Sequence, residues 1–428
     1  MRLFYTIGIW FYILGIRIAA LFGHGKARLM VKGWRDCLNV SMPKWLSADA
    51  GNIQTIKQSN NQTINTAWFH AASLGEFEQA RPVLEEYKRR HPDHRIVVTF
   101  FSPSGYEVRK NYAQADAVLY LPPDLPCTVR RFLDRYRPTV AFFVKYEFWY
   151  NYLGALHRRG IPTYIFSAIF RPNQYFFKGI PWFRNQLRDC FKHLFVQNEE
   201  SLNLLKSIGI EHCSVAGDTR FDRVHQIAVA AEGNEVVERF LDGHQGKVLV
   251  AGSTWPPDEA LITQAIRQSD NQAIRLILAP HVIGEEHLKQ IEALFPDSVR
   301  YSQVASGQWP EASNVLIIDN IGLLSKLYRY ADVAYIGGGF GVGIHNILEA
   351  VTFGKPVLFG PNYHKFQEAK DIIARGGGFS HHDGENLNQH LQPLLTDPEA
   401  YAKASQACLD YMNANLGSTE KILSTIDH

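Results

Sequence analysis

The chain is poor in cysteine and in net charge. Its five cysteines stand apart with no C-x-x-C pair, which argues against a zinc site or a disulfide framework and favours a reducing compartment. The 44 Lys and Arg residues against 42 Asp and Glu leave a formal net charge of +2. The composition therefore gives no reason to expect a nucleic-acid partner.

Two motifs of nucleotide enzymes are also absent. No D-x-D occurs anywhere, so the chain lacks an obvious carboxylate pair for a Mg²⁺ ion that bridges a diphosphate. No G-x-G-x-x-G fits the glycines at 337–343, which makes a nicotinamide dehydrogenase a poor interpretation. What remains is a chain of 428 residues with 46% apolar composition. This length predicts a globular protein of two or three domains.

The N-terminus is the one long apolar stretch. Residues 3–16 are uncharged, and Arg17 and a second apolar run at 18–22 follow. The segment is about long enough to cross a bilayer or to lie deep in one leaflet. The alternatives are a signal peptide, with Arg2 as its basic region and cleavage near Ala19 and Ala20, and a buried amphipathic helix.

A basic segment follows this apolar stretch and alternates with apolar residues. Its cations are Lys26, Arg28, Lys32, Arg35 and Lys44. The positive-inside rule then places the bulk of the chain on the cytoplasmic side, with the basic segment on an anionic leaflet.

Beyond a polar, loop-like stretch at 52–65, apolar runs alternate with helical patterns. The first series of predicted strands covers 67–71, 96–100, 118–120, 140–144, 163–167 and 194–197, with helices at 79–90 and 127–136 and a turn at 102–105. The second series covers 248–251, 274–279, 315–318, 333–336 and 356–359. This spacing is typical of βαβ units on parallel sheets.

The series predict two doubly wound α/β domains that face a cleft. We expect an N-terminal anchor at 1–22, a first domain at 23–212 and a second at 213–428, with the terminal helices packing back on the first domain. Ligands in such sheets bind at the carboxyl ends of the strands.

The stretch at 335–350, YIGGGFGVGIHNILEA, has the most distinctive composition. A strand, three glycines and a helix-like segment at 346–352 allow backbone N–H groups and a helix N-terminus to face a phosphate. His345 and Glu349 are spaced to share a helix face, where Glu349 can accept from ribose hydroxyls. The alternative is a tight strand-to-helix connection with an ordinary surface glutamate.

The loop after the first strand carries a second candidate. Gly75 allows a ligand to approach the backbone, and Glu76 lies at the carboxyl end of a strand. The alternative is structural, because Ser73-x-x-Glu76 also reads as a helix capping box.

Several motifs, spread over nearly the whole chain, together resemble those of one protein family. They are HAASLGE at 70–76, SPSGYE at 102–107, YLPPDLP at 120–126, KYEFWYN at 145–151, GDTRFDR at 217–223, GSTW at 252–255, GGGFGVGIHNILEA at 337–350 and GPNYHKFQEA at 360–369. Together they resemble the Kdo (3-deoxy-D-manno-octulosonic acid) transferases. The chain departs from the usual pattern of that family at Lys145, His281, Ile344 and Lys365.

The resemblance implies an inverting GT-B glycosyltransferase with two Rossmann-like domains and an N-terminal membrane anchor. It implies transfer of Kdo from CMP-Kdo to a lipid A precursor of the lipid IVA type, at the cytoplasmic face of the inner membrane. Neither a cofactor nor a metal is expected. The alternatives are another lipid-directed GT-B transferase that uses a UDP-sugar, and an inactive membrane-bound sugar-binding homologue.

The resemblance also implies residue roles, with Glu76 as the catalytic base. The expected substrate- and nucleotide-binding residues are Ser73, Gly75, Lys145, Glu147, Arg171, Lys178, Arg220, Ser253, Thr254, His281, Gly338, Gly339, His345, Asn346, Glu349 and Lys365. The cations among them suit a donor that carries a phosphodiester and a carboxylate. Helix-terminal N–H groups and arginine can stabilise a monophosphate leaving group without a metal.

Overall fold

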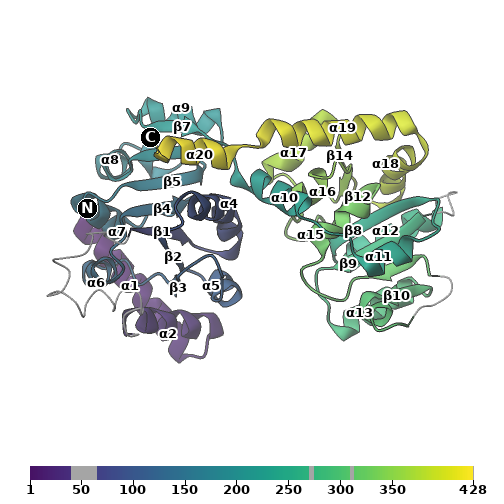
Figure 1. Cartoon of the computed structure of the whole chain (residues 1–428), viewed down its shortest axis with the longest axis horizontal. Coiled ribbons are helices and arrows are strands. Elements are labelled where there is room, and N and C mark those ends of the chain that lie inside the picture. Colours follow the sequence, from purple (N-terminus) through teal and green to yellow (C-terminus); the bar gives the residue numbers. More distant parts are fainter. Residues whose placement is uncertain (40–64, 269–273, 309–312, 428) are drawn as a thin grey trace. The chain divides into compact units, whose positions relative to one another are not determined.

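The computed structural model describes residues 1–39, 65–268, 274–308 and 313–427. Lys44 and almost all of the expected polar loop lie outside these ranges. The chain divides into two compact units: unit 1 comprises Met1–Arg223 and Gly417–His428, and unit 2 comprises Val224–Leu416 (Figure 1). The division falls after Arg223, whereas the sequence places it after His212.

Unit 1 is built on a parallel sheet of seven strands in the order β3-β2-β1-β4-β5-β6-β7. The strands are β1 Thr66–Ala71, β2 Arg95–Phe100, β3 Ala117–Tyr120, β4 Val140–Val144, β5 Thr163–Ala168, β6 His193–Val196 and β7 Cys213–Val215. Its helices are α1 Arg2–Leu21, α2 Gly25–Asn39, α4 Leu74–Arg90, α5 Pro103–Arg109, α6 Pro126–Tyr136, α7 Tyr150–Arg158, η1 Tyr175–Phe177, α8 Pro181–Cys190, α9 Glu199–Ser207 and α20 Ser418–Asp427; α10 Thr219–Val229 continues into unit 2.

Unit 2 repeats the design with a second parallel sheet of seven strands in the order β10-β11-β9-β8-β12-β13-β14. The strands are β8 Lys247–Thr254, β9 Ile274–Pro280, β10 Ser298–Arg300, β11 Val315–Ile317, β12 Val333–Ile336, β13 Val357–Phe359 and β14 Gly378–Ser380. Its helices are α11 Glu235–Leu241, α12 Pro256–Gln268, α13 Glu285–Leu294, α14 Tyr301–Ala305, α15 Leu324–Leu327, η2 Tyr328–Tyr330, α16 Leu348–Val351, α17 Gln367–Arg375, α18 Gly384–Thr396 and α19 Pro398–Asn415.

Burial on both faces explains the unbroken apolar strands. Every residue of β4, with the sequence VAFFV, is buried. Phe142 packs into the core that α4 and α20 cover, while Phe143 packs into the core on the other face. Helices on both sides of a parallel sheet require apolar side chains in both directions, so the alternation of a half-exposed strand is absent.

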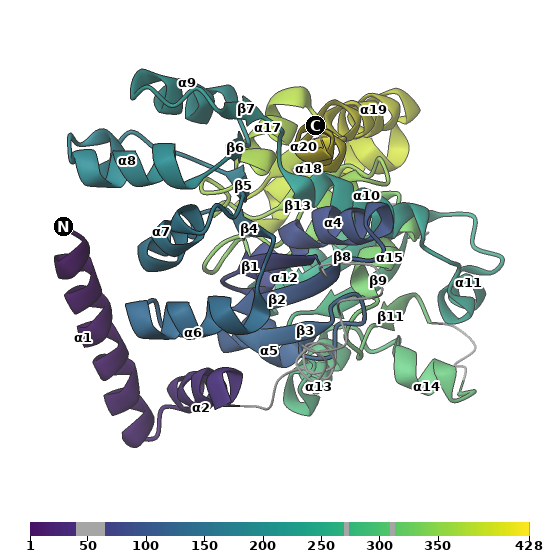
Figure 2. The ribbon, with the colours of Figure 1, turned by 60° about the vertical axis from the view of Figure 1, so that its left-hand side comes forward.

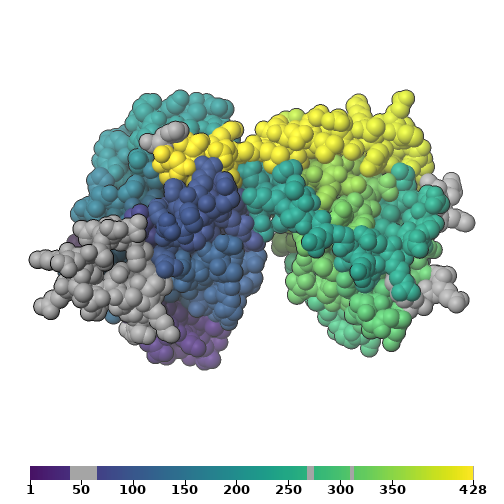
Figure 3. All heavy atoms as spheres, in the orientation of Figure 1, coloured from purple at the N-terminus to yellow at the C-terminus, as the bar shows by residue number. Residues whose placement is uncertain are grey.

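The last helix of the described chain belongs to unit 1. Ile422 and Leu423 of α20 are fully buried in the same core as residues of α4. Arg90, at the end of α4, donates to Asp427 at 2.9 Å and also pairs with Glu420. Figure 3 shows this yellow segment lying against the dark-blue surface of α4. The two crossings of the chain make unit 2 an insertion within unit 1.

The structure differs from the sequence prediction mainly at short elements. The strands β7, β10 and β14 were not predicted; each has three residues and lies at or near a sheet edge. The predicted turn at 102–105 is instead the start of α5, where the Ser102 hydroxyl accepts from the N–H of Ser104 at 3.3 Å and Pro103 takes the first helical position.

Helix α1 is long and apolar enough to cross a membrane. Its outer side chains are exposed, among them Phe4 and Leu21 at 72% and 82%, which does not fit the alternative of a buried helix. One side nevertheless docks on unit 1: the Tyr5 hydroxyl donates to Asp124 at 2.7 Å, and Arg2 donates to Asn151 at 3.1 Å. Figure 2 shows α1 along the margin of unit 1 with its outer side uncovered.

Candidate active site

The candidate catalytic groups of unit 1 lie at the carboxyl ends of β1 and β4. These neighbouring strands pair in parallel, with Phe69 opposite Phe142, and the strand order reverses between them. Glu76 lies in the first turn of α4, just after β1, and Glu147 follows β4. Doubly wound sheets form their ligand sites at such a reversal.

Glu147 lies at the centre of a hydrogen-bonded cluster. Its Oε2 is 2.6 Å from Trp149 Nε1, which donates to it, and 3.0 Å from His70 Nε2. His70 is fully buried, and its Nδ1 lies 2.9 Å from the hydroxyl of Thr99. These contacts fix the position of one carboxylate beside Glu76.

Glu76 is partly buried next to this cluster. Burial, and next the negative charge of Glu147, raise the pKa of the Glu76 carboxyl above its usual range, against the opposing charge of Lys145. A carboxylate with a raised pKa is a stronger base than an ordinary one, as proton abstraction requires.

The capping-box alternative for Glu76 is only partly realised. Ser73 is the N-cap of α4 but makes no side-chain capping hydrogen bond. Glu76 Oε2 accepts from the N–H of Ala72 at 2.7 Å instead. One carboxylate oxygen thus holds the loop, and the reciprocal bond of a capping box is not formed.

The other residues predicted in unit 1 have different environments. Lys145 adopts a left-handed backbone conformation, with φ of 58°, and Gly75 is exposed. Arg171 and Lys178 are exposed, and the guanidinium of Arg171 lies 5.8 Å from the ring of Tyr146. Arg220, in α10, pairs with Asp218 at 2.8 Å, and Arg223, a further cation of the same helix, pairs with Glu78 at 3.3 Å. The charges of Lys145 and Glu147 therefore act on Glu76, whereas Arg220 already forms an ion pair within the protein.

The glycine loop of unit 2 follows β12, beside the end of β8. A Cβ at Gly337 would lie 2.2 Å from the carbonyl oxygen of Ser253, and Gly338 has φ of 91°. The N–H of Gly338 donates to Asp258 Oδ2 at 3.0 Å. The glycines thus permit close packing of two loops, and the Gly338 N–H is held by a carboxylate, contrary to the expectation that it faces a phosphate.

The helix after this loop is shorter than predicted. Helix α16 covers only Leu348–Val351, so His345 precedes it and shares no helix face with Glu349. The side chain of Asn346 joins the two parts: its Nδ2 donates to Glu349 Oε1 at 3.1 Å, and its Oδ1 accepts from the N–H of Leu348 at 3.2 Å. Asn346 and Glu349 are therefore contacting neighbours.

Three rings form a row beside the glycine loop. His281 stacks on Trp255 with centroids 4.7 Å apart, and its ring lies 4.6 Å from that of His345. Burial, and next the neighbouring His281, lower the pKa of His345. A neutral His345 can both donate and accept a hydrogen bond.

The remaining predicted residues of unit 2 divide into packed and exposed positions. The buried Thr254 hydroxyl donates to Glu259 at 2.9 Å, and Ser253 has φ of 56°. A Cβ at Gly339 would lie 2.6 Å from the backbone of Gly360. Lys365 is exposed on the loop before α17.

Sequence reasoning missed several residues that organise both sites. Asp258 holds the N–H groups of Trp255 and Gly338 and accepts from the Tyr335 hydroxyl at 2.9 Å. Burial raises the pKa of Asp258. The available signal was an Asp-Glu pair directly after Trp-Pro-Pro, at a helix start. His70 and Trp149 lie inside recognised motifs but were not singled out.

Among the described residues, no group of three or more His, Cys, Asp and Glu side chains is arranged to hold a metal ion.

Comparison with known proteins identifies the fold class first. UDP-GlcNAc 2-epimerase from Neisseria meningitidis, solved bound to UDP-GlcNAc, matches with a TM-score of 0.59 at 17% identity, over 84% of this chain and 99% of that one. Two parallel seven-stranded sheets of this kind define a GT-B-like α/β fold.

Sequence comparison then shows which proteins the chain resembles. The family model described as 3-deoxy-D-manno-octulosonic-acid transferase (kdotransferase) matches residues 47–223. Transferases of this name from Aquifex aeolicus and Bordetella pertussis are each 27% identical, over 79% and 84% of this chain and 89% and 86% of theirs. Over most of its length the chain is therefore similar to Kdo transferases.

Proposed function

We propose that this protein is an inverting glycosyltransferase that moves Kdo from CMP-Kdo to a lipid A precursor of the lipid IVA type in lipopolysaccharide core biosynthesis. The observation that carries the proposal is the pair of carboxylates at the ends of β1 and β4. Burial and the charge of Glu147 raise the pKa of Glu76, in a chain that is similar to Kdo transferases over most of its length.

In this proposal Glu76 acts as the base. Its carboxylate takes the proton of an acceptor hydroxyl while that oxygen attacks the anomeric carbon of Kdo from the face opposite the leaving CMP. The new glycosidic bond forms as the bond to the phosphate oxygen breaks, so the configuration inverts. Glu147, held by Trp149 and His70, keeps Glu76 basic and does not itself need to move a proton.

Unit 2 binds the nucleotide in this proposal. The carboxylate of Glu349 accepts from the ribose hydroxyls, and His281, His345 and Lys365 serve the phosphodiester or the sugar carboxylate. Gly338 and Gly339 contribute close packing that shapes the loop, because the Gly338 N–H is already bound. A monophosphate leaving group can be stabilised by such donors without a divalent cation.

The proposed location is the cytoplasmic face of the inner membrane. The exposed apolar side of α1 suits the acyl region, and the cations of α2 suit an anionic leaflet. A lipid acceptor would then be met at the surface where it resides.

The direct test is an incubation of the full-length protein with CMP-Kdo and a tetra-acylated lipid A precursor, read by mass spectrometry. The expected product is the precursor with Kdo attached. A product formed only from a UDP-sugar would favour the alternative transferase. Binding of CMP-Kdo without any product would favour the inactive sugar-binding homologue.

A further inference from the structure

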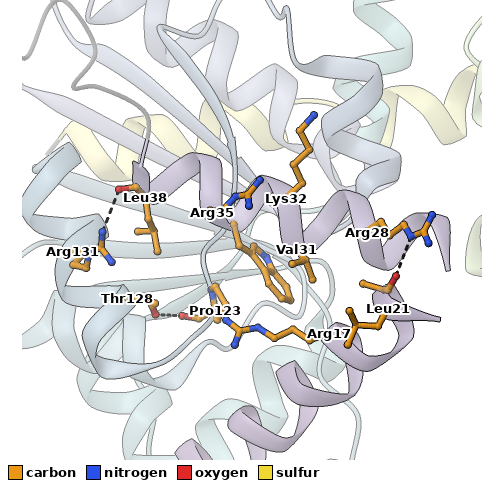
Figure 4. A pocket seen from close by; sticks show the side chains of 12 residues that line it. Arg17, Leu21, Arg28, Val31, Lys32, Arg35, Leu38, Pro123, Thr128 and Arg131 are labelled. Atoms are coloured by element: carbon orange, nitrogen blue, oxygen red, sulfur yellow. Dashed lines mark hydrogen bonds between the residues drawn. The ribbon is translucent and has the colours of Figure 1, made fainter. Parts of the chain in front are cut away.

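A basic cavity of about 690 Å³ lies between α1, α2 and the start of α6, apart from the carboxylates at the strand ends. Its lining contains five cations and no carboxylate: Arg17, Arg28, Lys32, Arg35 and Arg131. Figure 4 shows these side chains around the cavity, with Arg17 extending from α1 toward Pro123. Cations from three helices therefore surround one volume.

Among the described residues, no carboxylate lies within ion-pair distance of any of these five cations. Arg28 Nε donates to the carbonyl of Ala20 at 3.0 Å, and one terminal nitrogen of Arg131 donates to the carbonyl of Leu38 at 3.4 Å. Most of their other donors have no acceptor within the part of the chain that the structure describes, and the arginine fork fits a phosphate.

A buried donor in the cavity wall is an independent observation. Trp34 lines the cavity and is only 4% exposed, and its indole Nε1 is buried without a hydrogen-bond partner among the described residues. Buried N–H groups are nearly always satisfied, so an orphaned one on a residue that lines a cavity is expected to gain its acceptor when the side chains adjust to a ligand. A phosphate oxygen is such an acceptor.

The surroundings of the basic cavity indicate which kind of molecule carries the phosphate. The exposed apolar side chains of α1 border the cavity, and a second cavity of about 500 Å³, lined by Phe11, Tyr12 and Met30, opens between the same two helices. We propose that the basic cavity is a binding site for a lipid-borne phosphate, with the acyl chains of that lipid along α1.

Two sources supply this chemistry: an anionic phospholipid of the bilayer, and a phosphate of the lipid acceptor. Only the second rests on the proposed function. In both cases the site is a defined pocket and differs from a diffuse attraction between the basic segment and the membrane, because it depends on particular positions within the helices.

The chain offers a matched pair of double variants. Lys32→Gln with Arg131→Gln removes two cavity cations from α2 and α6. Lys206→Gln with Arg130→Gln removes two cations of the same types, at exposed positions that line neither cavity. The net charge changes equally, so any difference reports the cavity.

The first measurement titrates the full-length protein in neutral detergent with short-chain phosphatidic acid, using phosphatidylcholine of the same chain length as the blank. Each lost cation near a lipid phosphate weakens binding roughly fivefold, so the cavity pair should lose at least about tenfold more affinity than the control pair. This measurement needs no turnover, so it remains decisive if the proposed transfer fails.

The second measurement is the KM for the phosphorylated acceptor in the same detergent. A raised KM in the cavity pair assigns the site to the acceptor phosphate. An unchanged KM together with weakened phosphatidic acid binding assigns it to a membrane phospholipid. Equal behaviour of the two double variants in both measurements would overturn the proposal.

Trp34→Phe tests the buried donor separately, because it keeps an aromatic ring and removes the N–H. Phosphatidic acid binding should weaken roughly tenfold, as expected for a lost hydrogen bond to a charged group. Unchanged affinity would contradict the assignment of the indole to the ligand.

Discussion

The indole Nε1 of Trp149 lies 2.6 Å from Glu147 Oε2 and 3.0 Å from His70 Nε2, and its N–H donates to both. One donor thus connects the loop after β4 to the end of β1. Phe101 packs against the same indole with ring centroids 5.0 Å apart, which fixes it from the side of β2. The negative charge of Glu147 therefore has a set position, and its influence on Glu76 can be measured.

Glu76→Gln should reduce transfer by on the order of 10²-fold or more. The amide cannot take up a proton, but its oxygen can still accept from the N–H of Ala72, so the melting temperature should change little. The measurements are turnover and thermal unfolding on one preparation. Glu86→Gln, on the same helix α4, is the matched control and should transfer normally. Full turnover by Glu76→Gln would exclude the base role.

The pH profile of transfer should report the raised pKa of Glu76. Because only the ionised carboxylate accepts a proton, kcat/KM should fall as the pH drops through that pKa, at a pH above the usual range of a glutamate. Glu147→Gln removes a charge that raises this pKa, so the midpoint of the acid limb should move to lower pH. A midpoint unmoved by Glu147→Gln would show that another group limits the rate.

Glu349→Ala should weaken CMP binding by roughly 1.5–3 kcal/mol, the usual range for a hydrogen bond to a charged group. The comparison is Glu349→Gln, which retains an acceptor oxygen and should lose less. Isothermal titration with CMP gives both affinities. If both variants bind as the unmodified protein does, Glu349 only supports the contact with Asn346.

Transfer should survive an excess of EDTA. The proposed site stabilises a monophosphate leaving group with protein donors, so removal of divalent cations should leave the rate of product formation unchanged. Activity that disappears with EDTA and returns with Mg²⁺ would show that the phosphate is held differently.

Tyr5→Phe should loosen α1 from unit 1. Burial raises the pKa of Asp124 to about 6, so the stability associated with its protonated form is lost as the pH rises from about 4 to 6. Above that range the ionised Asp124 depends on Tyr5, and the loss of this donor should cost about 1–3 kcal/mol. Denaturant unfolding should therefore show a larger effect at pH 7.5 than at pH 5.

Tyr12→Phe, on the same helix, is the control for Tyr5→Phe, and its free energy of unfolding should be nearly unchanged.

An intact mass beginning at Met1 is expected for the membrane-bound protein. A mass that shows cleavage near Ala20 would instead identify the apolar segment as a signal peptide.

The sequence predicted the interior of both sheets because buried parallel strands are continuous apolar runs. It could not predict β10 or β14, since three residues at an edge carry too little pattern. In the glycine loop the sequence could not show that the acceptor of the Gly338 N–H is Asp258, because that residue lies 80 positions earlier in the chain. Motifs located Glu76 and Glu147, whereas the fold was needed to show that Trp149 joins His70 and Glu147.

The return of α20 to unit 1 has a consequence for synthesis on the ribosome. Arg90 and its partner Glu420 are separated by 330 residues, which at roughly 5–20 residues per second takes about 15 to 65 s to translate. During that interval α1 has already emerged, while the core beneath α4 still lacks Ile422 and Leu423. A prematurely terminated chain would keep this apolar surface uncovered, so we expect incomplete molecules to be removed by proteolysis before they act at the membrane.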